Sequence, residues 1–275
     1  MRTTDRFVVA GGHRLNTRVL GDIVPAEPTL VFLHGGLDCI PLWRGLPEAL
    51  VAATGRPALV YERWGHGQSD PLILPKVAEH RLNEAGPTLA ELLQAFDIRS
   101  ALLVGHSYGG CLALLATALH PERIKAAVAI APQLVMHPAA QEGLARAVAA
   151  WESGKLGRSL EKYHGANTER LFQGWISEIE DATIQARYEA LLRAIHRPVH
   201  VLVGDGDEYG YQPNLDLIER TVPAHYRTLE VLPGGRHHPH WHDLDGVVAR
   251  LVPFLKPQCA AQGRAITLDS AGVMA

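Results

Sequence analysis

The first candidate for chemistry is Ser107, which lies in the segment GHSYGG with Gly105 before it and Gly109 after it. The apolar run before this serine predicts a strand, and the residues after it predict a helix. A serine in such a tight strand-to-helix turn exposes its hydroxyl, and the turn needs glycines because flanking side chains would collide with neighbouring elements. The backbone N–H of Tyr108, at the start of the helix, can then donate to a developing oxyanion.

The acid that such a serine needs is expected in the turn GDGDEYG, residues 204–210. A serine hydroxyl is a weak nucleophile and requires a base that is itself held by an acid. In a sheet with this kind of turn, the acid follows the nucleophile along the chain and the histidine follows the acid. We predict Asp207, because it lies beyond the strand; Asp205 is the alternative that can bond its own backbone, and Glu208 is a weaker candidate.

Four histidines crowd into the segment GGRHHPHWHD, residues 234–243, after the next apolar strand. The chain order places the base in this loop, with His237 predicted and His238 as the alternative. The run also suggests a metal site, but a closed zinc site needs four ligands that converge tetrahedrally. A proline inside the run and a helix that starts within it would splay these side chains, so we predict no metal site. His240 and His242 are expected at the rim or at the start of a helix, where their charge can change near pH 6–7.

Six apolar runs predict the strands that position these residues. They cover residues 29–36, 58–63, 101–107, 125–132, 199–207 and 227–235, and helices are predicted over 42–54, 86–97, 109–120, 212–221 and 241–255. Continuous apolar runs are typical of parallel strands covered on both faces, and strand–helix alternation predicts a parallel sheet with crossover helices. The opening segment, FVVAGGHRLNTRVLG, predicts an antiparallel hairpin at one edge of that sheet.

Residues 133–197 interrupt this alternation, because they contain amphipathic helical stretches and no clear strand. The stretches cover residues 139–152, 156–163, 168–180 and 182–195. A helical insert between two strands predicts a cap over the carboxyl edge of the sheet, where open α/β folds bind ligands. The predicted organisation is an α/β core at 1–132 and 198–256, a helical cap at 133–197, and a C-terminal tail at 257–275 that lacks periodicity.

These motifs together resemble those of α/β-hydrolase-fold serine hydrolases, over roughly residues 7–255. The matching segments are LHGG at 33–36, ERWGHGQSD at 62–70, GHSYGG at 105–110, GDGD at 204–207 and PGGRHHPH at 233–240. The resemblance implies a catalytic triad of Ser107, Asp207 and His237. In this family the acid stands three residues after a strand-ending glycine, and the histidine lies in a loop framed by prolines. The resemblance also implies an oxyanion hole made by the N–H groups of Gly36 and Tyr108.

A serine at the nucleophile position indicates attack on a carbonyl, because family members that act on epoxides and haloalkanes use an aspartate there. The resemblance therefore implies an esterase-like enzyme, without metal or organic cofactor, that forms an acyl-enzyme on Ser107. A small or medium carboxylic ester or lactone is the expected substrate. The alternatives are a hydrolase of carbon–carbon bonds in ring-cleavage diketones, a cofactor-free oxygenase, and a non-catalytic ligand-binding member of the fold.

Composition and charge exclude other classes of function. The chain has 275 residues, 47% of them hydrophobic and 20% charged, and a net charge of −3, which is ordinary for a globular protein. No block of lysine or arginine stands out, so a small molecule is the expected partner rather than nucleic acid or a membrane. A homodimer is a possible assembly. Three sparse cysteines, and an N-terminus without a long apolar run, predict a cytoplasmic protein.

Overall fold

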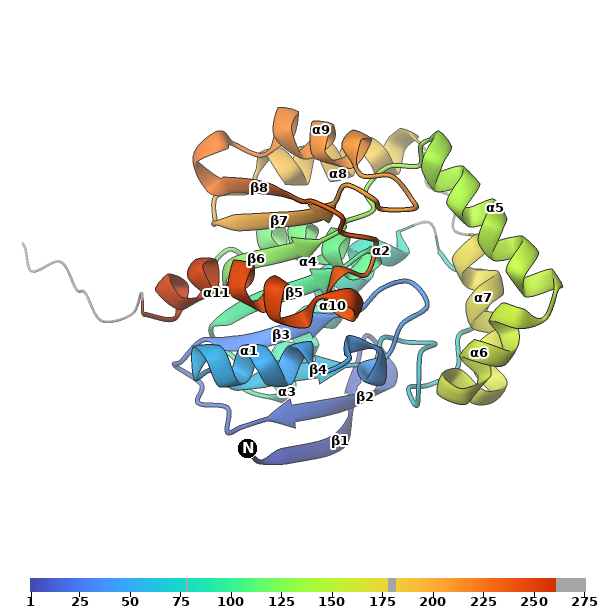
Figure 1. The fold of residues 1–275 in the computed structure, drawn as a ribbon. Helices are drawn as coiled ribbons and strands as arrows, with labels where there is room; N and C mark the ends of the chain where they lie inside the picture. The colour runs from blue at the N-terminus through green and yellow to red at the C-terminus, as the bar shows by residue number, and fades with distance from the viewer. Residues whose placement is uncertain (78, 178–181, 261–275) are drawn as a thin grey trace, which may run out of the picture.

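The computed structural model describes residues 1–77, 79–177 and 182–260, and one eight-stranded sheet runs through its centre (Figure 1). The strands follow the spatial order β1-β2-β4-β3-β5-β6-β7-β8. Strands β3 to β8 pair in parallel, whereas β1 and β2 form an antiparallel hairpin at one edge. Both features confirm the prediction from sequence. The strands are β1 Thr3–Ala10, β2 His13–Leu20, β3 Thr29–Leu33, β4 Ala58–Tyr61, β5 Ala101–His106, β6 Ile124–Ile130, β7 Val199–Gly204 and β8 Arg227–Leu232.

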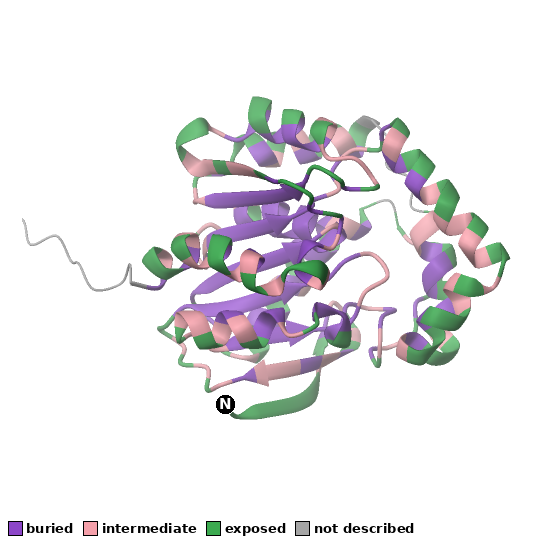
Figure 2. Cartoon of the chain, viewed as in Figure 1, coloured by how far each residue is buried: buried purple, intermediate pink, exposed green. Residues whose placement is uncertain are grey.

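Two hydrophobic layers, one on each face of the sheet, hold helices against it. In β3, Leu30 and Phe32 point into one layer, and Val31 and Leu33 point into the other. A strand that is covered on both faces is apolar along nearly all of its length, and Figure 2 shows the central strands buried along their length. The first layer packs under α1 Leu46–Thr54 and α11 Leu244–Ala260, and the second under α3 Leu89–Ala95, α4 Tyr108–Leu119, α8 Ala182–Arg193 and α9 Gln212–Thr221.

Short helical elements lie between these helices and strands. They are η1 Ile40–Trp43, α2 His80–Asn83, η2 Glu84–Thr88, η3 Gly165–Asn167, η4 Ala224–Tyr226 and α10 Pro239–His242. Within the described ranges, none of the helices combines the length and the apolar character that a membrane span requires.

Three helices form a cap beyond the carboxyl ends of the strands: α5 Pro138–Glu152, α6 Lys155–His164 and α7 Thr168–Ile176 (Figure 1). The predicted cap, residues 133–197, also included α8. That part of the prediction is wrong, because α8 packs against α4 and α9 and buries Tyr188 and Leu192 in the core. Residues 178–180, predicted as the end of a cap helix, lie outside the described residues.

The last helix extends beyond its predicted end. The boundary between core and tail was predicted after residue 256, but α11 continues to Ala260 through Pro253 and Pro257. The guanidinium of Arg56 donates to the carbonyl oxygen of Cys259 at 3.1 Å, so the last turn has a partner from the core. The rest of the predicted tail, residues 261–275, lies outside the described residues.

Candidate active site

Ser107 occupies a strained turn between β5 and α4. Its backbone has φ 53° and ψ −115°, a conformation that costs free energy for any residue with a side chain. A Cβ atom on Gly105 would overlap the carbonyl oxygen of Gly109, and one on Gly109 would overlap the carbonyl oxygen of Leu33. The close approach of neighbouring backbone therefore requires both glycines of the motif. The sequence motif predicts such collisions for side chains at these two positions.

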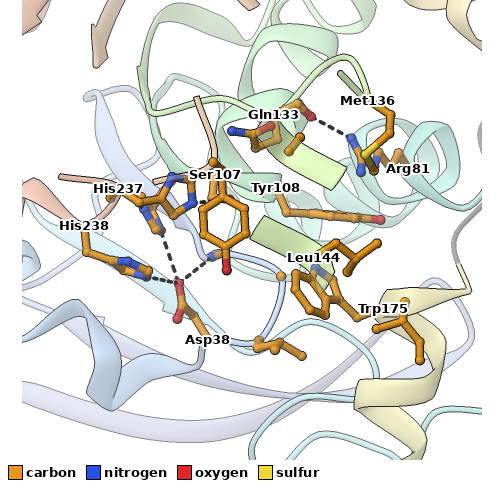
Figure 3. A pocket seen from close by; sticks show the side chains of 17 residues that line it. Asp38, Arg81, Ser107, Tyr108, Gln133, Met136, Leu144, Trp175, His237 and His238 are labelled. Carbon is orange, nitrogen blue, oxygen red and sulfur yellow. Dashed lines mark hydrogen bonds and ion pairs between the residues drawn. The ribbon is translucent and has the colours of Figure 1, made fainter. Parts of the chain in front are cut away.

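Three predicted side chains, Ser107, His237 and Asp207, meet in hydrogen-bonding order at this turn, and Figure 3 shows His237 beside Ser107. Nε2 of His237 lies 2.9 Å from Oγ of Ser107. Nδ1 of the same ring lies 2.9 Å from Oδ2 and 3.0 Å from Oδ1 of Asp207. His237 and Asp207 are both buried, at 4% and 8% exposure, so solvent competes little for these bonds. The loops after β5, β7 and β8 supply one residue each, as expected for the carboxyl edge of a parallel sheet.

The competing acids have other partners. Oδ1 of Asp205 accepts the N–H of Gly234 at 2.7 Å and so braces the turn between β8 and the histidine loop. The carboxylate of Glu208 accepts the backbone N–H of His237 at 3.1 Å, which fixes the loop and not the imidazole. Among the three candidates, only Asp207 contacts the ring of His237 through its carboxylate in the part of the chain described.

The remaining histidines of the run differ from one another. The ring of His238 stacks on Trp241 at 3.9 Å, and its Nε2 lies 3.7 Å from Oδ2 of Asp38, so it does not face the serine. His240 was expected at the rim or at a helix start; it lies at the start of α10 but is buried beside Trp43. Burial, reinforced by the neighbouring His106, lowers the pKa of His240 to about 2, so the prediction that it titrates near pH 6–7 is wrong. His242 is exposed, as expected.

The predicted oxyanion donors, Gly36 and Tyr108, both line the cavity next to Ser107. Tyr108 is the first residue of α4, where backbone N–H groups point out of the helix N-terminus. Gly36 follows β3 in a loop that passes under the cap. A Cβ atom there would come within 2.5 Å of Nε1 of Trp175, so a glycine leaves this side of the cavity open.

Comparisons with known proteins identify the fold. A family model described as "alpha/beta hydrolase fold" matches residues 28–155. The haloalkane dehalogenase DatA from Agrobacterium tumefaciens C58 superposes with a TM-score of 0.73 over 93% of this chain and 97% of its own, at 17% identity. The chain has the α/β-hydrolase fold. The fold expected from the sequence motifs is thereby confirmed.

Two curated relatives match this chain over part of its length. The proline iminopeptidase of Levilactobacillus brevis is 35% identical over 42% of this chain and 38% of its own. The 1-acylglycerol-3-phosphate O-acyltransferase ABHD5 of Mus musculus is 27% identical over 45% of this chain and 35% of its own. The matched segment spans less than half of either relative.

Buried polar groups brace the loop that follows β3 and contains Gly36. The guanidinium of Arg63 donates to the carbonyl oxygen of Gly35 at 2.7 Å, and Nε2 of His66 lies 2.9 Å from the carbonyl oxygen of Gly36. Nε2 of His164, from the cap helix α6, lies 3.1 Å from the carbonyl oxygen of Leu37. With three successive carbonyls fixed, the loop holds the N–H of Gly36 in place before any substrate binds.

A cavity of about 150 Å³ joins this machinery to the cap. Its cap side is apolar, lined by Met136, Ala140, Leu144, Trp175 and Ile176. Its core side contains Arg81, which donates to the carbonyl oxygen of Gln133 at 2.8 Å and lies 4.4 Å from the ring of Tyr108 (Figure 3). Sequence reasoning assigned no role to Arg81 or to Asp38, because each is a single charged residue outside any recognised motif.

Proposed function

We propose that this chain is a serine hydrolase that cleaves a small carbonyl substrate, a carboxylic ester or lactone, through an acyl-enzyme on Ser107. One observation carries the proposal: the imidazole of His237 bridges Oγ of Ser107 and the carboxylate of Asp207, with 2.9 Å on each side. A serine with a base at hydrogen-bond distance, and a base oriented by a buried acid, is the arrangement required for nucleophilic acyl transfer.

The mechanism follows from the proton positions that these contacts allow. An ionised Asp207 accepts hydrogen bonds and cannot donate them, so the proton between the two residues is on Nδ1 of His237. Nε2 of the same ring then presents a lone pair to Ser107. Nε2 therefore removes the proton from Oγ as Oγ attacks the carbonyl carbon. Asp207 stabilises the imidazolium that forms, and the imidazolium then protonates the leaving alkoxide. Water hydrolyses the acyl-enzyme by the same route, with His237 again as base.

The negative charge that develops on the carbonyl oxygen needs fixed donors. The N–H groups of Gly36 and Tyr108 fill that role, because both lie beside Ser107 in the cavity and belong to backbone that is already braced. Losing one such donor typically lowers the rate by about 100-fold or more.

The size of the cavity supports a small acyl group. About 150 Å³ holds a group of roughly the size of a benzene ring. The apolar cap side, with Leu144 and Trp175, suits a short alkyl or aryl chain, and the polar core side suits the reacting carbonyl.

A substrate panel tests the proposal. It compares p-nitrophenyl acetate, butyrate and octanoate with a γ-lactone and a ring-cleavage diketone, using the wild-type chain, Ser107→Ala and Ser159→Ala. Ser159 is an exposed residue of α6 and serves as the control. We expect turnover of a short ester or lactone that falls by about 10⁴-fold or more in Ser107→Ala and is unchanged in Ser159→Ala. Cleavage of the diketone alone would favour the carbon–carbon hydrolase, and activity that survives in Ser107→Ala would refute the serine mechanism.

A further inference from the structure

Three side chains of types that bind metal ions, from three separate segments of the chain, meet beside the triad. Asp38 follows β3, His106 ends β5, and His238 follows β8. Oδ2 of Asp38 lies 3.2 Å from Nδ1 of His106 and 3.7 Å from Nε2 of His238, and one ligand atom from each residue lies within 4.8 Å of the other two. All three residues line the cavity that contains Ser107, and Figure 3 shows Asp38 and His238 facing each other there.

The hydrogen bonds of His106 require a cation at this point. Its Nε2 lies 2.9 Å from the carbonyl oxygen of His237, and a carbonyl can only accept, so Nε2 carries the proton. In the neutral ring, Nδ1 then presents a lone pair to the Asp38 carboxylate at 3.2 Å. Two lone pairs at that distance repel each other. Either a second proton on His106 or a metal ion must lie between the two groups.

The geometry points to a site for a divalent transition-metal ion, formed by Asp38, His106 and His238, with an open coordination position toward the cavity. Two imidazoles and one carboxylate are a common ligand set for zinc sites that keep a fourth position for water or substrate. Bonds of about 2.0–2.1 Å in a tetrahedron place ligand atoms roughly 3.4 Å apart. The observed separations of 3.2 and 3.7 Å from Asp38 are close to that value.

Neighbouring groups already orient the three side chains through hydrogen bonds and ring stacking, as they do in known metal sites. A metal-binding histidine usually donates its other ring N–H to a carbonyl or carboxylate, and His106 does so to the carbonyl oxygen of His237. The carboxylate of Asp38 accepts the N–H of Gly35 at 3.1 Å, and the ring of His238 is held by stacking on Trp241. The ligands are therefore oriented without the metal.

The site does not depend on the hydrolase mechanism, because none of the triad side chains is a ligand. Its open position faces the same cavity as Oγ of Ser107, so an ion there would take an oxygen ligand from that cavity, either water or a carboxylate. Ser107→Ala should leave metal binding unchanged, which separates the two proposals experimentally.

Titration with Co²⁺ tests the site directly. The full chain is freed of metal with a chelator and titrated with Co²⁺, and the visible absorption, which is strong for four-coordinate Co²⁺, is recorded. We expect saturation at one equivalent, displacement of Co²⁺ by Zn²⁺, and affinity at least about 10-fold weaker in both Asp38→Asn and His238→Gln. His242→Gln is the matched control, because it removes an exposed histidine of the same run.

Three outcomes would overturn the proposal. If the wild-type chain binds no stoichiometric Co²⁺, a proton alone satisfies His106. If His242→Gln weakens binding as much as His238→Gln does, the ion binds to the exposed histidine run. If Asp38→Asn and His238→Gln, shown to be folded by circular dichroism, bind Co²⁺ as tightly as wild type, the three residues are not the ligands.

Discussion

Replacing Asp207 by asparagine keeps the shape of the side chain but changes which nitrogen of His237 carries the proton. Oδ1 of Asp207 already accepts the backbone N–H of Tyr209 at 2.8 Å, so the amide oxygen of an asparagine is expected to keep that contact. The amide NH₂ would then face Nδ1 of His237, which must become an acceptor. The ring proton moves to Nε2, where it faces Oγ of Ser107 and blocks the base. The same exchange in other Ser-His-Asp enzymes lowers kcat by about 10⁴-fold, equivalent to roughly 5.4 kcal/mol of transition-state stabilisation.

The assay is the steady-state kcat on the best short ester, with Asp205→Asn as the matched control. Asp205 lies in the same turn, but it only accepts the N–H of Gly234, which an asparagine oxygen also does. We expect Asp207→Asn to lose about 10⁴-fold in kcat while Asp205→Asn stays within about 3-fold of wild type. Near-normal turnover by folded Asp207→Asn, or an equal loss in Asp205→Asn, would show that the acid is assigned incorrectly.

Three further predictions concern the turn, the cap and pH. Gly109→Ala should lower the free energy of unfolding, measured by urea titration, by about 3 kcal/mol or more, because the new Cβ atom would overlap the backbone of Leu33. Gly157→Ala is the control and should leave the free energy of unfolding unchanged, because a Cβ atom there makes only ordinary contacts. Trp175→Ala, which enlarges the apolar end of the cavity, should shift the best p-nitrophenyl ester toward longer chains; an unchanged chain-length profile would contradict this position for Trp175. Burial lowers the pKa of His164 below its usual value near 6.5, so the unfolded chain binds the extra proton first. The free energy of unfolding is then retained above pH 6.5 and decreases as the pH falls from 6.5, by about 1.4 kcal/mol per pH unit. In urea titrations from pH 7.5 to 5, His164→Gln should remove this contribution to the pH dependence of the free energy of unfolding.

The strands and the nucleophile turn were predictable because local patterns determine them. Strand β3 is apolar from Leu30 to Leu33 because both faces are covered, and that pattern is visible without a structure. Gly105 and Gly109 are required by contacts within one strand–turn–helix unit, so their spacing around Ser107 carries the information. The order of acid and histidine along the chain then follows from the sheet.

Other parts depend on contacts between distant segments, which no local pattern records. The helical period of α8 shows that it has an apolar face, but only the structure shows that this face packs on α4 and not over the cavity. Asp38 stands alone in its loop, and its partners, His106 and His238, are 68 and 200 residues away. Trp175 reaches the cavity from the cap, and its proximity to Gly36 is a purely tertiary contact.

Labelling with a fluorophosphonate tests the central claim most directly, because the reagent forms a covalent bond only with an activated serine. The folded chain is incubated with the reagent, and intact mass and peptide mapping locate the adduct. The arrangement of His237 and Asp207 predicts one adduct, on Ser107, that is absent from Ser107→Ala and greatly slowed in Asp207→Asn. A folded wild-type chain that takes up no label, or takes it up at another residue, would contradict the assignment of Ser107 as the nucleophile.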